Sequence, residues 1–130
     1  MENSSDKLAG TQAGMSILLV EDHEDTLRWM VRLLNLSGHR VTTATSLASA
    51  RSAAEAESFE VVISDLGLPD GSGLELIQQL LARNPGTKGI ALTGSADHAS
   101  AEECLRAGFL KHITKPVDIA ALEKVLEQLR

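Results

Sequence analysis

Five polar residues of this sequence stand after short apolar runs, at the points where buried strands would end. Asp65 ends the run "VVIS" and is followed by a loop that contains a proline and three glycines. The others are Glu21 and Asp22 after "SILLV", Thr93 after "KGIAL", and Lys115 shortly after "FLKHI". Together these residues offer three carboxylates, a hydroxyl group and an ammonium group.

Three carboxylates in one place repel one another, so they are stable only when protonated or when a cation lies between them. Oxygen ligands with no cysteine or histidine at ligand spacing favour a hard divalent ion, Mg²⁺ or Mn²⁺. Such an ion commonly has a phosphate oxygen among its ligands. Lys115 would act as a point charge on an anion and Thr93 as its hydrogen-bond partner. Asp65 could then attack phosphorus and form an aspartyl phosphate.

The elements that would position these residues alternate strand and helix along the chain. Strands are predicted at Ser16–Val20, Arg40–Thr45, Glu60–Ser64, Lys88–Leu92 and Phe109–Ile113. Helices are predicted near Asp25–Ser37, from a cap at Ser46 to Glu57, near Ser72–Arg83, near Asp97–Ala107, and after a cap at Asp118. Apolar strands separated by helices indicate a parallel sheet covered on both faces. We therefore expect an α/β, doubly wound, flavodoxin-like fold with five strands in the order 2-1-3-4-5 and a ligand site at the carboxyl ends of the strands.

Composition favours one domain and excludes several classes of protein. Residues 1–14 are polar and without period, so we expect a flexible leader followed by a single domain over residues 15–130. The net charge of −6 argues against direct nucleic-acid binding and against binding to an anionic membrane. The single cysteine, Cys104, is consistent with a reducing cytoplasm, and no apolar run is long enough for membrane insertion.

From about Ser16 to Arg130 the chain resembles the response-regulator receiver domain of two-component signalling. The resemblance depends on "LLVEDHED", on "SDLGLPDGSG", on Thr93 followed by Gly94, and on "AGFLKHITKP", all in the expected order. It implies that Asp65 is the phospho-acceptor. The metal would be held by Asp22, Asp65 and the backbone carbonyl of Gly67, with Glu21 acting mainly through water.

The same resemblance implies the remaining parts of a signalling site. Thr93, Gly94 and Lys115 would contact the phosphoryl group, and the peptide bond between Lys115 and Pro116 would be cis. Thr93 would also form a switch with His112, which stands where most receivers have Tyr or Phe. The donor would be the phosphohistidine of a histidine kinase or a histidine phosphotransfer domain. The signal would leave through the face of the fourth helix, fifth strand and fifth helix, towards an output domain or a second copy of the chain.

Such a domain would catalyse only its own phosphorylation and dephosphorylation, either as a stand-alone regulator or as part of a hybrid histidine kinase. Two alternatives stay open, a phosphorylation-independent pseudo-receiver and an aspartyl-phosphate phosphohydrolase. Haloacid-dehalogenase phosphatases place a second Asp two residues after the nucleophile, where this chain has Gly67. A flavodoxin-type flavin-binding function is disfavoured, because the acidic pair after the first strand would repel the phosphate of the flavin.

Side chains outside these motifs carry simpler expectations. His23 is expected to be an exposed residue at the start of a helix and not a metal ligand, because hard cations prefer oxygen. His39 and His98 are expected to be solvated. Cys104 is expected to be a small buried residue, and Trp29 to be partly exposed on the first helix.

Overall fold

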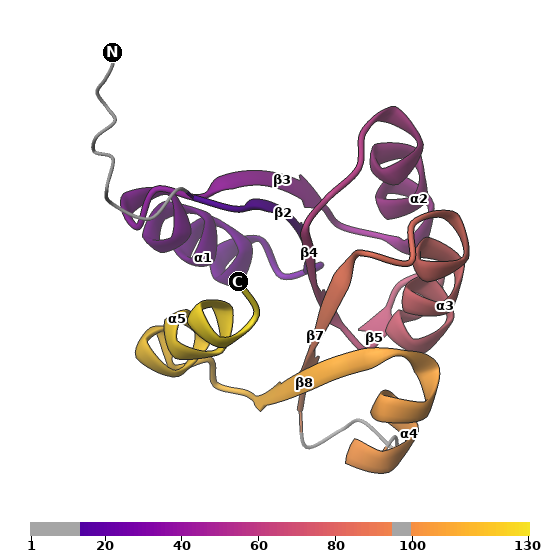
Figure 1. Cartoon of the computed structure of the whole chain (residues 1–130). Coiled ribbons are helices and arrows are strands. Elements are labelled where there is room, and N and C mark those ends of the chain that lie inside the picture. Colours follow the sequence, from indigo (N-terminus) through magenta and orange to yellow (C-terminus); the bar gives the residue numbers. More distant parts are fainter. Residues whose placement is uncertain (1–13, 95–99) are drawn as a thin grey trace.

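The computed structural model describes residues 14–94 and 100–130 (Figure 1). The first half contains β2 (Ser16–Val20), α1 (Glu24–Leu36), β3 (Arg40–Ala44), α2 (Leu47–Ala56) and β4 (Val61–Asp65). The second half contains β5 (Gly67–Leu68), β6 (Gly71–Ser72), α3 (Gly73–Arg83), β7 (Lys88–Thr93), α4 (Ala101–Ala107), β8 (Phe109–Thr114) and α5 (Ile119–Gln128). The predicted alternation of strands and helices is confirmed. The small β5–β6 hairpin was not predicted, since the sequence indicated only a loop there.

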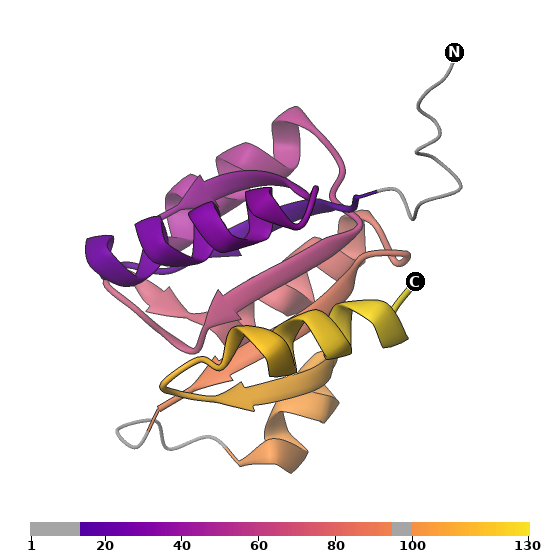
Figure 2. The ribbon, with the colours of Figure 1, turned by 90° about the vertical axis from the view of Figure 1, so that its left-hand side faces the viewer.

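Five strands form one parallel sheet in the order β3-β2-β4-β7-β8. This is the predicted doubly wound order, in which the chain starts near the middle and winds first to one edge and then to the other. Figures 1 and 2 show α1 and α5 on one face of the sheet and α2, α3 and α4 on the other. The two faces are covered as expected for a sheet whose central strands are apolar on both sides.

The core consists of a layer of side chains on each side of the sheet. In β2, Ile17 and Leu19 pack with residues of α1 and α5, whereas Leu18 and Val20 pack with residues of α2 and α3. All five β2 residues are buried. Because successive strand residues point to opposite faces, a strand covered on both faces is apolar at every position from Ile17 to Val20 rather than alternating.

The two helix caps predicted from the sequence are confirmed. Ser46 caps α2 by accepting a hydrogen bond from the backbone N–H of Ser49, and Asp118 caps α5 by accepting one from that of Ala120. Gly38 and Gly108 follow α1 and α4 with φ angles of 92° and 125°, which favour glycine. The predicted start of the fourth helix near Asp97 lies outside the described residues, and α4 is described from Ala101 with Ser100 as its cap.

The prediction that His39 is solvated is wrong, because the ring of His39 is buried. Its Nδ1 accepts a hydrogen bond of 3.0 Å from the backbone N–H of Met15, and its Nε2 lies 3.3 Å from Oε1 of Glu123 on α5. The α1–β3 turn thus places the ring between the start of the domain and its last helix. His98 lies outside the described residues.

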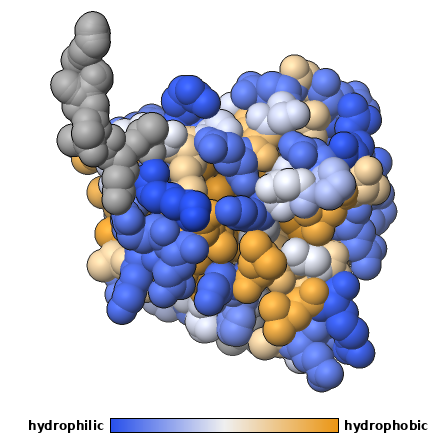
Figure 3. Space-filling view, in the orientation of Figure 1, coloured by the Kyte–Doolittle hydropathy of each residue, from blue (hydrophilic) through white to orange (hydrophobic). Residues whose placement is uncertain are grey.

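The remaining surface expectations hold where they are testable. Cys104 is 1% exposed and Trp29 is 44% exposed, as predicted. Leu105 on α4 and Leu110 on β8 are also exposed, and Figure 3 shows apolar groups among polar ones on the face that Figure 1 presents. No helix in the described ranges combines the length and the apolar character that a membrane span requires.

Candidate functional site

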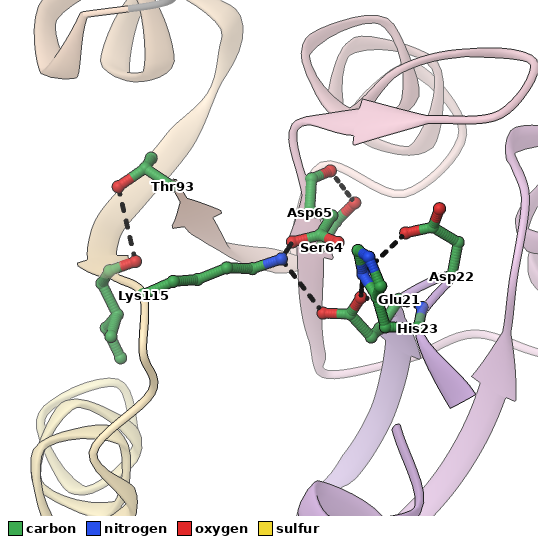
Figure 4. Close-up of polar contacts among 8 residues, drawn as sticks. Glu21, Asp22, His23, Ser64, Asp65, Thr93 and Lys115 are labelled. Carbon is green, nitrogen blue, oxygen red and sulfur yellow. Dashed lines mark hydrogen bonds and ion pairs between the residues drawn. The ribbon is translucent and has the colours of Figure 1, made fainter. Parts of the chain in front are cut away.

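The carboxyl ends of β2, β4 and β8 bring three of the predicted residues together (Figure 4). Glu21 follows β2 directly, and Asp65 is the last residue of β4. The register pairs Val20 with Ser64, so Glu21 and Asp65 come side by side. Lys115 follows β8, which lies on the far side of β7 from Asp65. Convergence at this edge, expected from the sequence, is therefore observed.

Lys115 makes ion pairs with both buried acids. Its Nζ contacts Oδ1 of Asp65 and lies 3.3 Å from Oε1 of Glu21. The side chains of Glu21 and Asp65 are 0% and 5% exposed. The peptide bond between Lys115 and Pro116 is cis, as the resemblance implied. The backbone N–H of Lys115 donates a 2.7 Å hydrogen bond to the carbonyl of Thr93, which ties the loop after β8 to the end of β7.

Burial and charge set the protonation of this cluster. Burial, together with the neighbouring Glu21, raises the pKa of Asp65 from 3.8 to about 7, although the Lys115 ammonium opposes the change. Burial alone would also raise the pKa of Glu21. That effect is outweighed by hydrogen bonds from His23, by the Asp65 carboxyl and by Lys115, so the pKa of Glu21 is lowered. Desolvation disfavours the ammonium, but its contact with Asp65 raises the pKa of Lys115. The two acids are thus pushed apart in pKa, and Asp65 is the one poised near neutrality.

The ring of His23 enters this cluster, which the sequence reading missed. His23 is exposed, with 72% of its side chain accessible, and it is the cap residue of α1, both as predicted. Its Nδ1, however, lies 3.0 Å from Oε2 of Glu21 and 3.5 Å from Oδ1 of Asp22. The hydrogen bond to Glu21 and the charge of Asp22 raise the pKa of His23. Nothing in the spacing of "EDHED" indicates that the ring turns back towards the acids instead of out into solvent.

The donor set fits a divalent cation. One ligand atom each from Glu21, Asp22, His23 and Asp65 lies within 4.8 Å of the others. In the described part of the chain, Oε1 of Glu21 is buried without a hydrogen-bond partner, and its contact with the ammonium is an ion pair only. A cation placed among these oxygens would compensate the repulsion between the carboxylates.

The loop after Asp65 is held on both sides. Gly67 begins β5 and pairs with Ser72 of β6, while the use of its carbonyl as a metal ligand stays a prediction. The backbone N–H of Gly73 donates a 2.8 Å hydrogen bond to the carbonyl of Leu66. A Cβ atom at Gly73 would overlap the carbonyl oxygen of Asp65, so the close approach of α3 to the end of β4 requires glycine.

Asp70, which the sequence reading did not single out, attaches this loop to α2. Its carboxylate accepts hydrogen bonds from the backbone N–H groups of Leu47 at 2.7 Å and Ala48 at 3.0 Å. These bonds lower the pKa of Asp70. An Asp before a glycine is typical of a turn, but the partner, a helix that starts 23 residues earlier, is not visible in the sequence.

The predicted switch residues lie on neighbouring strands. Thr93 ends β7, and its Oγ1 lies 3.5 Å from the carbonyl oxygen of Ile113. His112 on β8 is paired in register with Ala91 and is exposed. Thr93 and Ala91 are two residues apart on β7, so their side chains share a face of the sheet with that of His112. Gly94 follows Thr93 directly. The contacts of Thr93, Gly94 and Lys115 with a phosphoryl group stay predictions.

The fold and this site are those of a receiver domain, and comparison with known proteins identifies the same class of protein. Residues 17–127 match the response regulator receiver domain family. The chain therefore belongs to that family and is a receiver domain of two-component signal transduction.

Relatives of several sizes are similar to the chain. A 14.6 kDa protein of Leptolyngbya boryana is 35% identical over 91% of this chain and 92% of its own length. The photosynthetic apparatus regulatory protein RegA of Cereibacter sphaeroides is 32% identical over 82% of this chain but only 58% of its own length. The match to the response regulator protein PilR of Pseudomonas aeruginosa covers only 24% of the length of PilR. A CheY-like receiver domain structure from Methanospirillum hungatei has a TM-score of 0.82 at 32% identity, covering 90% of this chain and 94% of that one. The chain thus spans nearly all of some relatives and only the receiver-sized part of others.

Proposed function

We propose that this chain is a phospho-accepting receiver, in which Asp65 takes a phosphoryl group from a phosphohistidine partner. The observation that carries the proposal is the shared ion pair of Lys115 with the buried carboxylates of Asp65 and Glu21. An ammonium held at the nucleophile is placed to neutralise a phosphoryl oxygen once the group has been transferred.

A divalent ion, Mg²⁺ or Mn²⁺, fits the cluster, and Asp22 and Asp65 would hold it, with the carbonyl of Gly67 as a further ligand. Glu21 would act mainly through water, because it is buried and already bound to Lys115 and His23. When bound, the ion supplies charge neutralisation for the entering phosphoryl group. It also favours the ionised form of Asp65, whose pKa near 7 would otherwise leave part of the nucleophile protonated at neutral pH.

In the transfer step, an ionised carboxylate oxygen of Asp65 forms a bond to phosphorus as the bond from phosphorus to the partner's histidine nitrogen breaks. The electron pair of that bond stays on the imidazole, which leaves as a neutral ring without a proton from this chain when its other nitrogen is already protonated. Lys115 shifts from the carboxylate to a phosphoryl oxygen, and Thr93 offers its hydroxyl to another. Position and charge are all that this chemistry requires of the protein.

The chain would act on no other substrate, and its phosphoryl group would persist as a signal. The position two residues after Asp65 is Gly67, so the loop offers no carboxylate there as a general acid for rapid hydrolysis. The partner would be a cytoplasmic histidine kinase or histidine phosphotransfer domain. Output would pass through the α4–β8–α5 face to an output domain or a second copy, in line with longer relatives named as regulators.

Phosphorylation with a small acyl phosphate, such as acetyl phosphate, tests the proposal. We expect Mg²⁺-dependent, acid-labile incorporation in the parent chain and none in Asp65→Asn. Titration with beryllofluoride, monitored by amide NMR, should give saturable shifts that spread from Asp65 to β8. A pseudo-receiver would show neither result, and a phosphohydrolase would release phosphate steadily without accumulating the phosphorylated protein.

A further inference from the structure

His23 is a titratable side chain of the cluster that the proposed mechanism does not use. It occupies the cap position of α1, where Ser, Thr, Asp or Asn would accept a hydrogen bond from the helix. Its side chain makes no such bond and lies against Glu21 and Asp22 instead. The first turn of α1 therefore has no capping hydrogen bond from the His23 side chain. Instead, Nδ1 of His23 lies beside the carboxylate oxygens of Glu21 and Asp22.

We propose that His23 is a metal ligand that turns the acidic cluster into a mixed nitrogen and oxygen site, selective for borderline ions such as Zn²⁺ and Co²⁺ over Mg²⁺. This inference rests on the proposed function, because it concerns the same metal site. Carboxylate, carbonyl and water ligands suit Mg²⁺, whereas an imidazole adds affinity for Co²⁺ and Zn²⁺ and adds little for Mg²⁺.

The geometry permits the ligation with small movements. The four candidate ligand atoms lie within 4.8 Å of one another. Ligands of a zinc ion lie about 2 Å from it, so they can be at most about 4 Å apart. The distances of 3.0 Å and 3.5 Å from Nδ1 of His23 to Glu21 and Asp22 already meet this limit. The side chains of His23 and Asp22 are 72% and 33% exposed, so they have room to move closer to Asp65, whereas Glu21 is fully buried. Any adjustment can therefore be made by the exposed members of the cluster.

If His23 acts on the site only through its charge and not as a ligand, a different result is expected. An imidazolium beside Glu21 and Asp22 would compete with every divalent ion in the same way, because the competition depends on charge alone. Its removal would then raise the affinity for Mg²⁺, Co²⁺ and Zn²⁺ by similar factors. A ligand, in contrast, changes the ratio of these affinities.

The test is a set of calorimetric titrations of the tag-free chain with Mg²⁺, Co²⁺ and Zn²⁺, for the parent and for His23→Asn. Asn is a favoured residue at a helix cap, so the variant should fold, and amide NMR checks that it does. The matched control is His112→Asn, which removes an exposed histidine on β8. We expect His23→Asn to lose at least about tenfold in affinity for Zn²⁺ and Co²⁺ while its affinity for Mg²⁺ changes by less than about threefold. The visible spectrum of bound Co²⁺ should change in His23→Asn and not in the control.

An unchanged ratio of Zn²⁺ to Mg²⁺ affinity in His23→Asn would overturn the inference, whether both affinities rise together or neither changes. That result leaves the proposed function intact, provided that the parent binds Mg²⁺ and accepts a phosphoryl group on Asp65. If the parent does neither, the proposed function fails, and the metal role of His23 fails with it.

Discussion

Lys115 forms an ion pair with Asp65 although the two residues stand at the ends of strands that are not neighbours, since β7 lies between β4 and β8. The lysine side chain therefore reaches across the end of β7, and its own backbone N–H is bound to Thr93 at that end. Any group that binds Asp65 must compete for the same ammonium. A change at the nucleophile is in this way connected to the loop after β8.

The first prediction concerns the stability of Asp65→Asn. A carboxyl group whose pKa is higher in the folded state than in the unfolded state opposes folding when it ionises. For Asp65 this cost is absent below about pH 4 and grows as the pH rises from 3.8 to about 7. We expect Asp65→Asn to be more stable than the parent by roughly 1–3 kcal/mol at pH 8 without metal, and equally stable near pH 4.

Urea denaturation at the two pH values, in the presence of EDTA, measures this difference. Asp22→Asn is the control, since Asp22 is exposed and lies in the same cluster. A parent that is as stable as Asp65→Asn at pH 8 would mean that the buried carboxylate is fully compensated by Lys115.

The second prediction separates the two acids after β2. Asp22→Ala should weaken Mg²⁺ binding more than Glu21→Ala does, because Asp22 is exposed and available as a direct ligand. Glu21 is already bound to Lys115 and His23. Trp29 is the only tryptophan in the sequence and lines the same surface pocket as Lys115, so its fluorescence can follow the titration. Equal dissociation constants for the two variants would contradict this assignment of the ligands.

The third prediction is that Lys115→Ala uncouples phosphorylation from the conformational response. The variant should still be phosphorylated on Asp65, more slowly, because the metal site and the nucleophile remain. Without the ammonium, the phosphoryl group has no direct link to the loop after β8. Amide NMR with beryllofluoride should show shifts near Asp65 but few in β8. If β8 responds as in the parent, Thr93 alone carries the signal.

The fourth prediction concerns Asp70, whose carboxylate joins the loop after Asp65 to the start of α2. Asp70→Ala should speed amide hydrogen exchange at Leu47 and Ala48 and lower the thermal midpoint. Because the pKa of Asp70 is lowered in the folded state, its contribution is present above the unfolded pKa and is lost as the pH falls through the folded value. The difference between parent and variant should therefore be largest near neutral pH and smallest in acid. A difference that does not depend on pH would indicate that the charge of the carboxylate is unimportant.

Strand ends and helix caps were predictable because they depend on residues close together in the sequence. Apolar runs end at Asp65 and near Lys115, and the parallel topology then places those ends at one edge. The positions of His39, His23 and Asp70 were not predictable. Each is decided by a partner from a distant element, or by a side chain that turns towards the site instead of solvent. A histidine in a polar turn and an aspartate before a glycine look alike in sequence whether they are solvated or bound.

The last prediction concerns His112, whose ring is exposed on β8 and shares a face of the sheet with Thr93. If phosphorylation draws the Thr93 hydroxyl towards Asp65, the space beside Thr93 opens and the ring can enter it. We therefore expect the His112 ring resonances to shift on beryllofluoride binding and the ring to become less accessible to a water-soluble paramagnetic probe. His39 is the internal control, since its ring is fixed between Met15 and Glu123. His112→Tyr should keep phosphorylation, because the family holds an aromatic ring at this position. If the His112 ring resonances shift no more than those of His39 on beryllofluoride binding, the output of this receiver lies on a face other than α4–β8–α5.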